Sequence, residues 1–468
     1  MIRSVFLSLV SFGILFAQDA ELVLRTTVGY GTMLASRPLA DEQKAEAKRL
    51  GAAAQAAAAG GKYGDAMRSY AQGTALMMGQ EWTPAVEFTA GLQAKADHAV
   101  VAPGATVQVT LGTMFAATRP MTEKVAVTLT LRRPNEMAGP PVAAAMIVNA
   151  AKLPMVIEAK IPGDAAGDYL VDARLSLGEK SLPGRTISVH VEDLAKDVAA
   201  LRKRNPEDPT AAYVLALYER ADRGEMSPFR IDFKKEFARA NELLDARAAG
   251  KDPFAGKAGD FKKAYRSGVD ASLQPYRLFV PAEYDGSKAA GLVVALHGMG
   301  GDENSIFDQY AAGRMKAEAE KRGLFVVCPK GRGPASMYRG DAETDVLDVL
   351  AQVRKDYKID NKKVYLMGHS MGAFGTWSIA MKYPEMFAAL GPISGGGNPA
   401  GMEKIKAIPQ YIVHGDNDKT VPVEQSRMMV EAAKKLGTPI VYVEVPKGSH
   451  VDIAVPNFAP MLDFFVKQ

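Results

Sequence analysis

Short apolar runs alternate with helix-forming runs through the C-terminal part of the chain, from Ala271 onward. Asp341–Tyr357, Ala373–Tyr383 and Val423–Leu436 have the composition and spacing of helices that cover a sheet. The apolar runs between them are short and rich in Val, Ile and Leu, as in buried strands. The alternation predicts an α/β domain over residues 260–468, with a mostly parallel sheet covered by helices on both faces. The predicted strands are Leu278–Val280, Leu292–Leu296, Leu324–Cys328, Val364–Met367, Ala389–Ile393, Tyr411–Val413 and Val441–Val445.

A period of two governs residues 85–192. Val125, Val127, Leu129 and Leu131 occupy every second position, as in a strand with one buried face. Other runs in this region repeat the alternation, and Pro and Gly turn signals separate them. Half-buried strands at this regular spacing predict a small β-sandwich of immunoglobulin-like type.

Helix-forming composition occupies the segments on either side of this predicted sandwich. Residues 19–84 contain the alanine-rich run Asp41–Ala59, then two glycines, then a run from Tyr63 with helical spacing. They predict a helical hairpin that resembles a single tetratricopeptide unit, and a flexible linker is the alternative for the alanine tract. Residues 193–259 predict a helical connector that ends in a linker.

Residues 1–18 have the layout of a secretory signal peptide. Arg3 gives a positively charged start, Val5–Phe16 is mostly apolar, and the chain turns polar again at Gln18. The apolar run is too short to span a bilayer comfortably. We therefore expect a secreted or periplasmic protein with no membrane span after signal removal. A buried N-terminal helix is the alternative.

Composition argues against several classes of function. Charged residues make up 24% of the 468 residues, the net charge is +4, and no basic stripe occurs, so nucleic-acid binding is not expected. The single cysteine, Cys328, has no partner for an internal disulfide, and its apolar neighbours indicate a small core residue. His98 and His190 lack partners at metal-ligand spacing, so both are expected at the surface. No metal or other cofactor is expected.

The clearest candidate for chemistry is a serine between a predicted strand and a predicted helix. The strand Val364–Met367 runs into Gly368–Gly372, which has the pattern Gly-x-Ser-x-Gly around Ser370. This tight turn lifts the serine hydroxyl clear of the backbone, and glycine fits best two positions to either side. A serine attacks an acyl carbon only when a base removes its proton. The pattern therefore predicts a nucleophile at Ser370 and requires a base.

His450 is the candidate base, because it follows the predicted strand Val441–Val445 late in the chain. A carboxylate must orient it, and Asp416 and Asp418 both follow the strand Tyr411–Val413. The order serine, aspartate, histidine is the one used by α/β hydrolases. Taken alone, His450 would be interpreted as a histidine of a surface loop.

An acyl-transfer site also needs backbone donors for the oxyanion of the tetrahedral intermediate. The first residue of the helix after the serine, Met371, should supply one amide. The glycine-rich segment after Leu292–Leu296 should supply the other, and we expect it from Met299. His297 and His369 are expected to pack and to shape loops rather than to transfer protons.

The region from Ala271 to Gln468 resembles the secreted α/β-hydrolase esterases often labelled "predicted peptidase". These esterases are related to feruloyl esterases, polyhydroxybutyrate depolymerase-like esterases and the prolyl oligopeptidase catalytic domain. In that family the acid is the aspartate of His-Gly-x-x-Asp-x-x-Val-Pro, which implies Asp418 here. Ala373 stands where many relatives have glycine, and it is small enough to leave the chemistry intact. The segments that carry the resemblance are Gln274–Pro281, Leu296–Gly298, Gly368–Gly372, Gly375–Trp377, Tyr383-Pro384, Phe387–Ala389, Pro392–Gly397 and His414–Pro422.

These features predict an exported serine hydrolase that cleaves carboxylic esters through an acyl-enzyme. The segment Asn398–Pro409 is charged rather than an apolar lid, which favours short-chain or aryl esters, including esters linked to polysaccharide. A serine peptidase of prolyl oligopeptidase type is the alternative, but the repeated blades of its β-propeller are not found in residues 21–259. The alternative from another class is a binding or adhesion protein with an inert hydrolase domain. Such a domain would be expected to lack Ser370, Asp418 or His450, and all three are present here.

Overall fold

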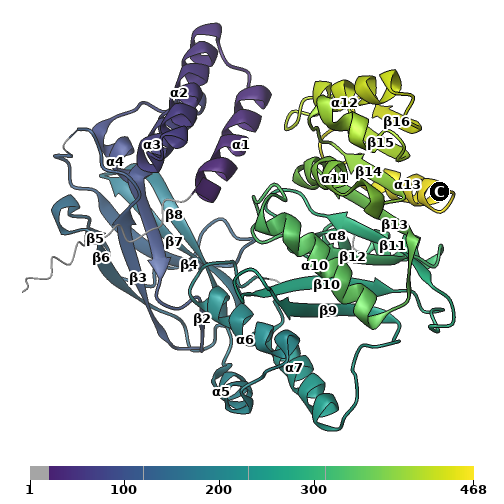
Figure 1. Ribbon diagram of the computed structural model, residues 1–468. Helices are drawn as coiled ribbons and strands as arrows, with labels where there is room; N and C mark the ends of the chain where they lie inside the picture. Colours follow the sequence, from purple (N-terminus) through teal and green to yellow (C-terminus); the bar gives the residue numbers. More distant parts are fainter. Residues whose placement is uncertain (1–19, 120, 230, 311–312) are drawn as a thin grey trace, which may run out of the picture. The chain divides into compact units, whose positions relative to one another are not determined.

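The computed structural model describes residues 20–119, 121–229, 231–310 and 313–468 (Figure 1). The predicted signal peptide, residues 1–18, lies outside the described residues. The chain divides into two compact units. The first unit comprises Met1–Asp197 and Leu217–Lys234, and the second comprises Val198–Ala216 and Lys235–Gln468. Within the described ranges, no helix is both long enough and apolar enough to cross a membrane.

The first unit begins with three helices that pack on one another. The Tyr30 hydroxyl donates a hydrogen bond to the backbone oxygen of Ala47, 2.7 Å away, and its ring centroid lies 5.1 Å from that of Tyr70. These residues come from three different helices, so the predicted hairpin is present and a further helix covers its apolar face. The alanine tract is helical rather than a flexible linker. The helices are α1 (Ala20–Ser36), α2 (Asp41–Ala59) and α3 (Tyr63–Met77).

Two β-sheets of the first unit share one apolar core. Their strand orders are β1-β3-β6 and β2-β8-β7-β4-β5. Val107 and Val109 of the first sheet and Val127 and Leu129 of the second are buried in the same cluster. The alternating residues therefore form a β-sandwich, and its immunoglobulin-like type stays a prediction. The strands are β1 (Leu92–Ala96), β2 (Val100–Val101), β3 (Thr106–Thr113), β4 (Ala126–Arg132), β5 (Met146–Ile147), β6 (Met155–Lys160), β7 (Gly167–Leu177) and β8 (Lys180–Val191).

Two details of the first unit correct the expectations from sequence. The start of the predicted sandwich is a helix, α4 (Pro84–Gly91), because the Thr83 side chain caps its first turn and proline is favoured there. His190 is partly buried rather than freely exposed, since its side chain is 13% exposed and its Nδ1 lies 2.7 Å from Asp168 Oδ1. The side chain of His98 is 62% exposed, as expected.

The predicted connector is helical, and the boundaries between the two units fall within its helices. These are α5 (Ala195–Arg204), α6 (Pro209–Asp222) and α7 (Phe233–Ala248). A strand follows that the sequence did not predict, β9 (Gly259–Arg266), at one edge of the sheet of the second unit. Asp260, Lys262 and Lys263 interrupt its apolar positions. Charged residues are common on edge strands, and they hide the alternation by which strands are recognised.

The second unit is built on an eight-stranded sheet in the order β16-β15-β14-β13-β11-β12-β10-β9. Neighbouring strands from β16 to β12 run parallel, whereas β10 pairs antiparallel with both β12 and β9. The remaining strands are β10 (Leu273–Val280), β11 (Ala290–Leu296), β12 (Phe325–Pro329), β13 (Ile359–His369), β14 (Ala389–Ile393), β15 (Gln410–Gly415) and β16 (Ile440–Val445). This is the strand order of the α/β-hydrolase fold, so the fold class predicted from sequence is confirmed.

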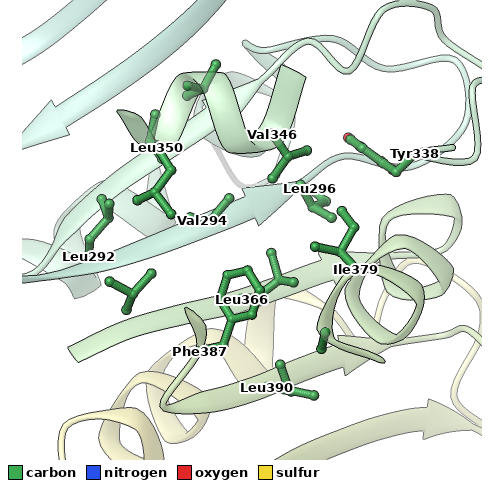
Figure 2. Close-up of a cluster of buried hydrophobic side chains, with 14 of the residues drawn as sticks. Leu292, Val294, Leu296, Tyr338, Val346, Leu350, Leu366, Ile379, Phe387 and Leu390 are labelled. Carbon is green, nitrogen blue, oxygen red and sulfur yellow. The ribbon is translucent and has the colours of Figure 1, made fainter. Parts of the chain in front are cut away.

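Both faces of this sheet are buried. Leu292, Val294 and Leu296 of β11 belong to one core cluster, and Val293 and Ala295 belong to another, as the period of a strand requires. Figure 2 shows the first cluster, in which the β11 side chains approach those of a covering helix. The helices on that face are α10 (Asp341–Asp356), α11 (Met371–Lys382) and α12 (Glu424–Lys435). The helices on the other face are α8 (Ser305–Asp308), α9 (Arg314–Glu320) and α13 (Phe458–Phe465).

Candidate active site

Ser370 occupies a sharp turn between β13, which ends at His369, and α11, which begins at Met371. Its backbone φ is 56° and its ψ is −119°, a conformation that costs energy for a residue with a side chain. A Cβ on Gly368 would overlap the backbone of Gly372, and a Cβ on Gly372 would overlap the backbone oxygen of Leu296. The two glycines of the motif are therefore required by close backbone approach.

The structure brings the predicted base and one of the two predicted acids to this serine. His450 Nε2 lies 2.9 Å from Ser370 Oγ, and His450 Nδ1 lies 2.6 Å from Asp418 Oδ2. The other aspartate, Asp416, is exposed and accepts a hydrogen bond from the backbone N–H of Lys447 at 2.6 Å. The geometry thus selects Asp418 over Asp416 as the partner of the histidine.

Asp418 is held as a carboxylate. Burial by itself raises its pKa, but hydrogen bonds from His414 and His450 outweigh burial and keep the pKa of this carboxyl well below its usual range. The backbone N–H groups of Thr420 and Val421 donate to its Oδ1 at 2.8 and 2.9 Å. Oδ1 is therefore fixed by the loop, and Oδ2 faces the histidines.

A second Ser–His pair, which sequence reasoning missed, approaches Asp418 from the interior. His414 is fully buried, its Nε2 lies 3.2 Å from Asp418 Oδ2, and its Nδ1 lies 2.7 Å from Ser426 Oγ. Asp418 Oδ2 thus lies between two Ser–His pairs, one at the candidate site and one in the core. The signal for His414 was its place in the motif His-Gly-x-x-Asp, but no local pattern marks Ser426.

His369, next to the serine, holds the loop of His450 through its backbone. Its Nε2 lies 2.7 Å from the His450 carbonyl oxygen, and its Nδ1 lies 2.6 Å from the Tyr310 hydroxyl. Burial and the charge of His450 lower the pKa of His369 to about 4, so the ring is neutral near neutral pH. A neutral ring then donates from Nε2 to the His450 carbonyl and accepts from Tyr310. Ser394 also donates to this carbonyl, at 3.1 Å.

The two predicted oxyanion donors flank the serine. Met371 is the first residue of α11, and the first N–H groups of a helix have no acceptor within it. A Cβ on Gly298 would lie 3.3 Å from Ser370 Cβ, so the glycine-rich loop after β11 runs directly beside the nucleophile. In that loop Gly300 donates to Pro334 and Gly301 donates to Gly298. Neither of these two hydrogen bonds uses the Met299 amide, so this amide can donate to an oxyanion.

The site can therefore supply a nucleophile, a base, an anionic partner for the base and two backbone donors. These are the groups that acyl transfer needs. In the part of the chain that the structure describes, no group of three or more His, Cys, Asp or Glu side chains is placed to hold a metal ion.

Comparison with known proteins associates this part of the chain with esterases. Residues 275–429 match the model of the Esterase family. A bifunctional acetylxylan esterase/xylanase from Neocallimastix patriciarum is 32% identical over 137 residues, which cover 29% of this chain and 20% of that protein. A protein named "Probable feruloyl esterase C" from Aspergillus terreus is 28% identical over 189 residues, which cover 39% of this chain and 65% of that protein.

Among solved structures, that of a thermostable esterase is 18% identical, with a TM-score of 0.40 and coverage of 81% of this chain and 99% of that chain. The chain spans about a fifth of the length of the first curated relative and just under two thirds of the second. The family match ends before His450.

Proposed function

We propose that this chain, whose residues 275–429 match the Esterase family model, is an exported serine hydrolase that cleaves carboxylic esters. The observation that carries the proposal is the hydrogen-bonded series from Ser370 Oγ through His450 to Asp418, with contacts of 2.9 and 2.6 Å. The names of the relatives, an acetylxylan esterase and a feruloyl esterase, support an ester rather than a peptide as the bond that is cleaved.

In the proposed first step, Ser370 Oγ attacks the ester carbonyl while His450 Nε2 takes its proton. Asp418 holds the histidine in the tautomer whose Nε2 is free to accept, and then stabilises the imidazolium. The amides of Met371 and Met299 donate to the oxyanion of the tetrahedral intermediate. The intermediate collapses when His450 returns the proton to the alkoxide leaving group, which gives the free alcohol and an acyl-serine.

Water completes the cycle by the same route in reverse. His450 takes a proton from a water molecule as its oxygen attacks the acyl carbon, and the second oxyanion uses the same two amides. Collapse breaks the bond to Ser370 Oγ, which recovers its proton from His450, and the carboxylic acid leaves. Each group therefore acts in both halves of the reaction, and no further reactant besides water is needed.

Asparagine at either aspartate tests this assignment. Asp418→Asn should lower kcat on p-nitrophenyl acetate on the order of 10⁴-fold, because the amide cannot hold the required tautomer. Asp416→Asn is the matched control: the same change two residues away, at an exposed side chain, should leave kcat within about threefold. Ser370→Ala should lower kcat by about 10⁶-fold while the protein stays folded. If Asp416→Asn were the damaging change, the proposed acid would be wrong.

Export is supported by the layout of residues 1–18 in the sequence. We expect the mature protein to begin near Gln18 or Asp19. Intact-mass measurement of protein recovered from the native host should show a chain shortened by about eighteen residues. A full-length chain recovered from the cytosol would contradict export.

The proposed substrates are short-chain or aryl esters, including esters on polysaccharide. The segment that could have formed a lid, residues 398–409, contains a short 3₁₀ helix over Pro399–Ile405, and its apolar residues Met402 and Ile405 are buried in the core. Helix α12 likewise buries Met429 and Val430 in that core. These elements are therefore committed to the fold, which supports a cleft without a hydrophobic cover.

A further inference from the structure

A cavity of about 650 Å³ lies in the first unit, and all of its lining residues belong to that unit. It is therefore distinct from the candidate active site, whose residues belong to the second unit. Its wall is mostly apolar and includes the rings of Tyr70 and Trp82 and the side chains of Met67, Met78 and Met114. The volume is in the range of small-molecule sites.

Arg185 is the one cation among the described residues that line this mostly apolar wall. The guanidinium of Arg185 donates from Nη1 to the backbone oxygen of Gly184 at 2.7 Å, and from Nη2 to those of Thr89 and Ala90 at 2.9 and 2.6 Å. Its Nε donates to the backbone oxygen of Leu92. These acceptors are neutral, and Thr89 and Ala90 lie at the C-terminal end of α4, which favours a positive charge.

The charge of Arg185 has no counter-ion among the described residues. Burial lowers its pKa, and no neighbouring acid offsets this. A guanidinium has five N–H groups, and the four contacts to carbonyl oxygens leave one on Nη1. Arg185 is partly buried and its carbonyl partners carry no net charge, so the cavity offers a positive charge and a hydrogen-bond donor to a ligand that supplies a negative oxygen.

We propose that this cavity binds an aryl carboxylate, with its carboxylate at Arg185 and its ring among the aromatic and methionine side chains. A flat ring suits this wall, since methionine sulfur and aromatic faces both make favourable contacts with aromatic rings. The carboxylate supplies the anion that the described residues lack at Arg185. The site is independent of ester cleavage, and its ligand need not be a substrate of Ser370.

Fluorescence can report on this cavity directly, because the chain has only two tryptophans. Trp82 lines the cavity, whereas Trp377 is buried in the second unit with its indole N–H bonded to Gln410 Oε1 at 2.9 Å. We would titrate the full chain carrying Ser370→Ala with 3-phenylpropanoate and with its uncharged amide. Both should change the emission in a saturable way, and the carboxylate should bind more tightly. Trp82→Phe should remove the signal while calorimetry still detects binding.

Arg185→Met keeps an unbranched apolar side chain but removes the charge. It should weaken binding of the carboxylate by roughly 10- to 100-fold and leave the amide within about twofold, as expected for loss of a hydrogen bond between charged groups. Arg133→Met is the matched control, because Arg133 also donates to a backbone oxygen, that of Ala166, in the same unit but not at the cavity. It should leave both affinities unchanged.

Because Arg185 also bonds to the end of α4, its substitution could unfold the first unit. Ala71→Leu is a second variant that narrows the cavity without touching the guanidinium, and it should weaken both ligands. Equal affinity of the carboxylate and the amide in the parent chain, or affinities unaffected by Ala71→Leu, would overturn the proposal. So would the absence of any saturable change in Trp82 emission.

Discussion

Asp418 Oδ2 lies within hydrogen-bonding distance of two imidazole nitrogens, at 2.6 Å from His450 and 3.2 Å from His414. The second histidine is fully buried. Its neighbours are Ser426, whose hydroxyl also donates to the Gly395 oxygen at 2.9 Å, and the Val421 oxygen at 2.9 Å. At the scale of single residues, His414 is thus placed to fix the direction and the charge of the carboxylate that orients the base.

This arrangement makes His414 a positioning residue whose effect should appear in kcat. His414→Asn removes the ring whose Nε2 lies 3.2 Å from Asp418 Oδ2 and 2.9 Å from the Val421 oxygen, and we expect kcat to fall by roughly 10- to 100-fold, the value of a buried polar contact with a charged group. KM should stay nearly constant, because no substrate contact is removed. Steady-state kinetics on p-nitrophenyl acetate would measure both.

Ser426→Ala should produce a smaller loss in the same direction, because it leaves His414 in place but removes the partner of Nδ1. Ser378→Ala, which removes a hydroxyl bonded to the Gly375 oxygen in α11, serves as the matched control with normal kinetics. If His414→Asn lowered the melting temperature while kcat remained normal, His414 would be a structural residue only.

At the scale of elements, each candidate site residue follows the carboxyl end of a strand. Ser370 follows β13, Asp418 follows β15, His450 follows β16, and the Met299 loop follows β11. Parallel strands bring these ends to one edge of the sheet, where α/β proteins carry their sites. The covering helices and the 3₁₀ helix over Pro399–Ile405 bury their apolar residues in the sheet's own core.

Because the covering helices and the 3₁₀ helix bury their apolar residues in the core, none of these elements is available as an apolar cover, and acyl-chain length should discriminate substrates. Each methylene buried by an enzyme adds about 0.8 kcal/mol of binding, and an open cleft buries few of them. We expect kcat/KM to be higher for acetyl and butyryl p-nitrophenyl esters than for the palmitoyl ester. No activation should occur at an oil–water interface. A clear preference for the palmitoyl ester would contradict the open cleft.

At the scale of the whole molecule, the second unit includes residues that come before the first strand of its sheet, β9. The Tyr357 hydroxyl donates to the backbone oxygens of Phe254 and Lys257 at 2.8 and 3.1 Å, and Thr210 exchanges hydrogen bonds with the backbone of Ala264 in β9. Glu236 of α7 bonds to Lys262 of β9. The α/β fold therefore draws on α6, α7 and the segment that follows them as well as on the predicted domain.

Because the second unit begins before its sheet, the residue at which a shortened chain starts should determine whether that chain is stable. A chain that starts at residue 195 keeps the segments of the second unit together and should remain active on small soluble esters. A chain that starts at residue 260 loses α6, α7 and the first residue of β9, and we expect a lower melting temperature or insoluble protein. Thermal unfolding and ester turnover of the two chains would decide it. Equal stability would mean that α6 and α7 contribute nothing to the fold.

The sequence by itself determined the alternation of strands and helices, the turn around Ser370 and the chain order of the three site residues. These features are local, since a buried strand, an amphipathic helix and a glycine-bounded turn each leave their pattern within a few residues. The α/β-hydrolase fold followed from them. Choosing Asp418 over Asp416 before the structure required a family motif, because both follow the same strand.

Only the tertiary structure decided which groups meet. It placed Ser426 behind His414, paired His190 with Asp168, added β9 to the sheet edge and left Arg185 beside a mostly apolar cavity with no acid among the described residues as its partner. Each of these depends on contacts between distant positions or on the charge of an edge strand, neither of which has a period along the chain. His450 and Ser370 are 80 residues apart, and their contact exists only because parallel strands end at the same edge of the sheet.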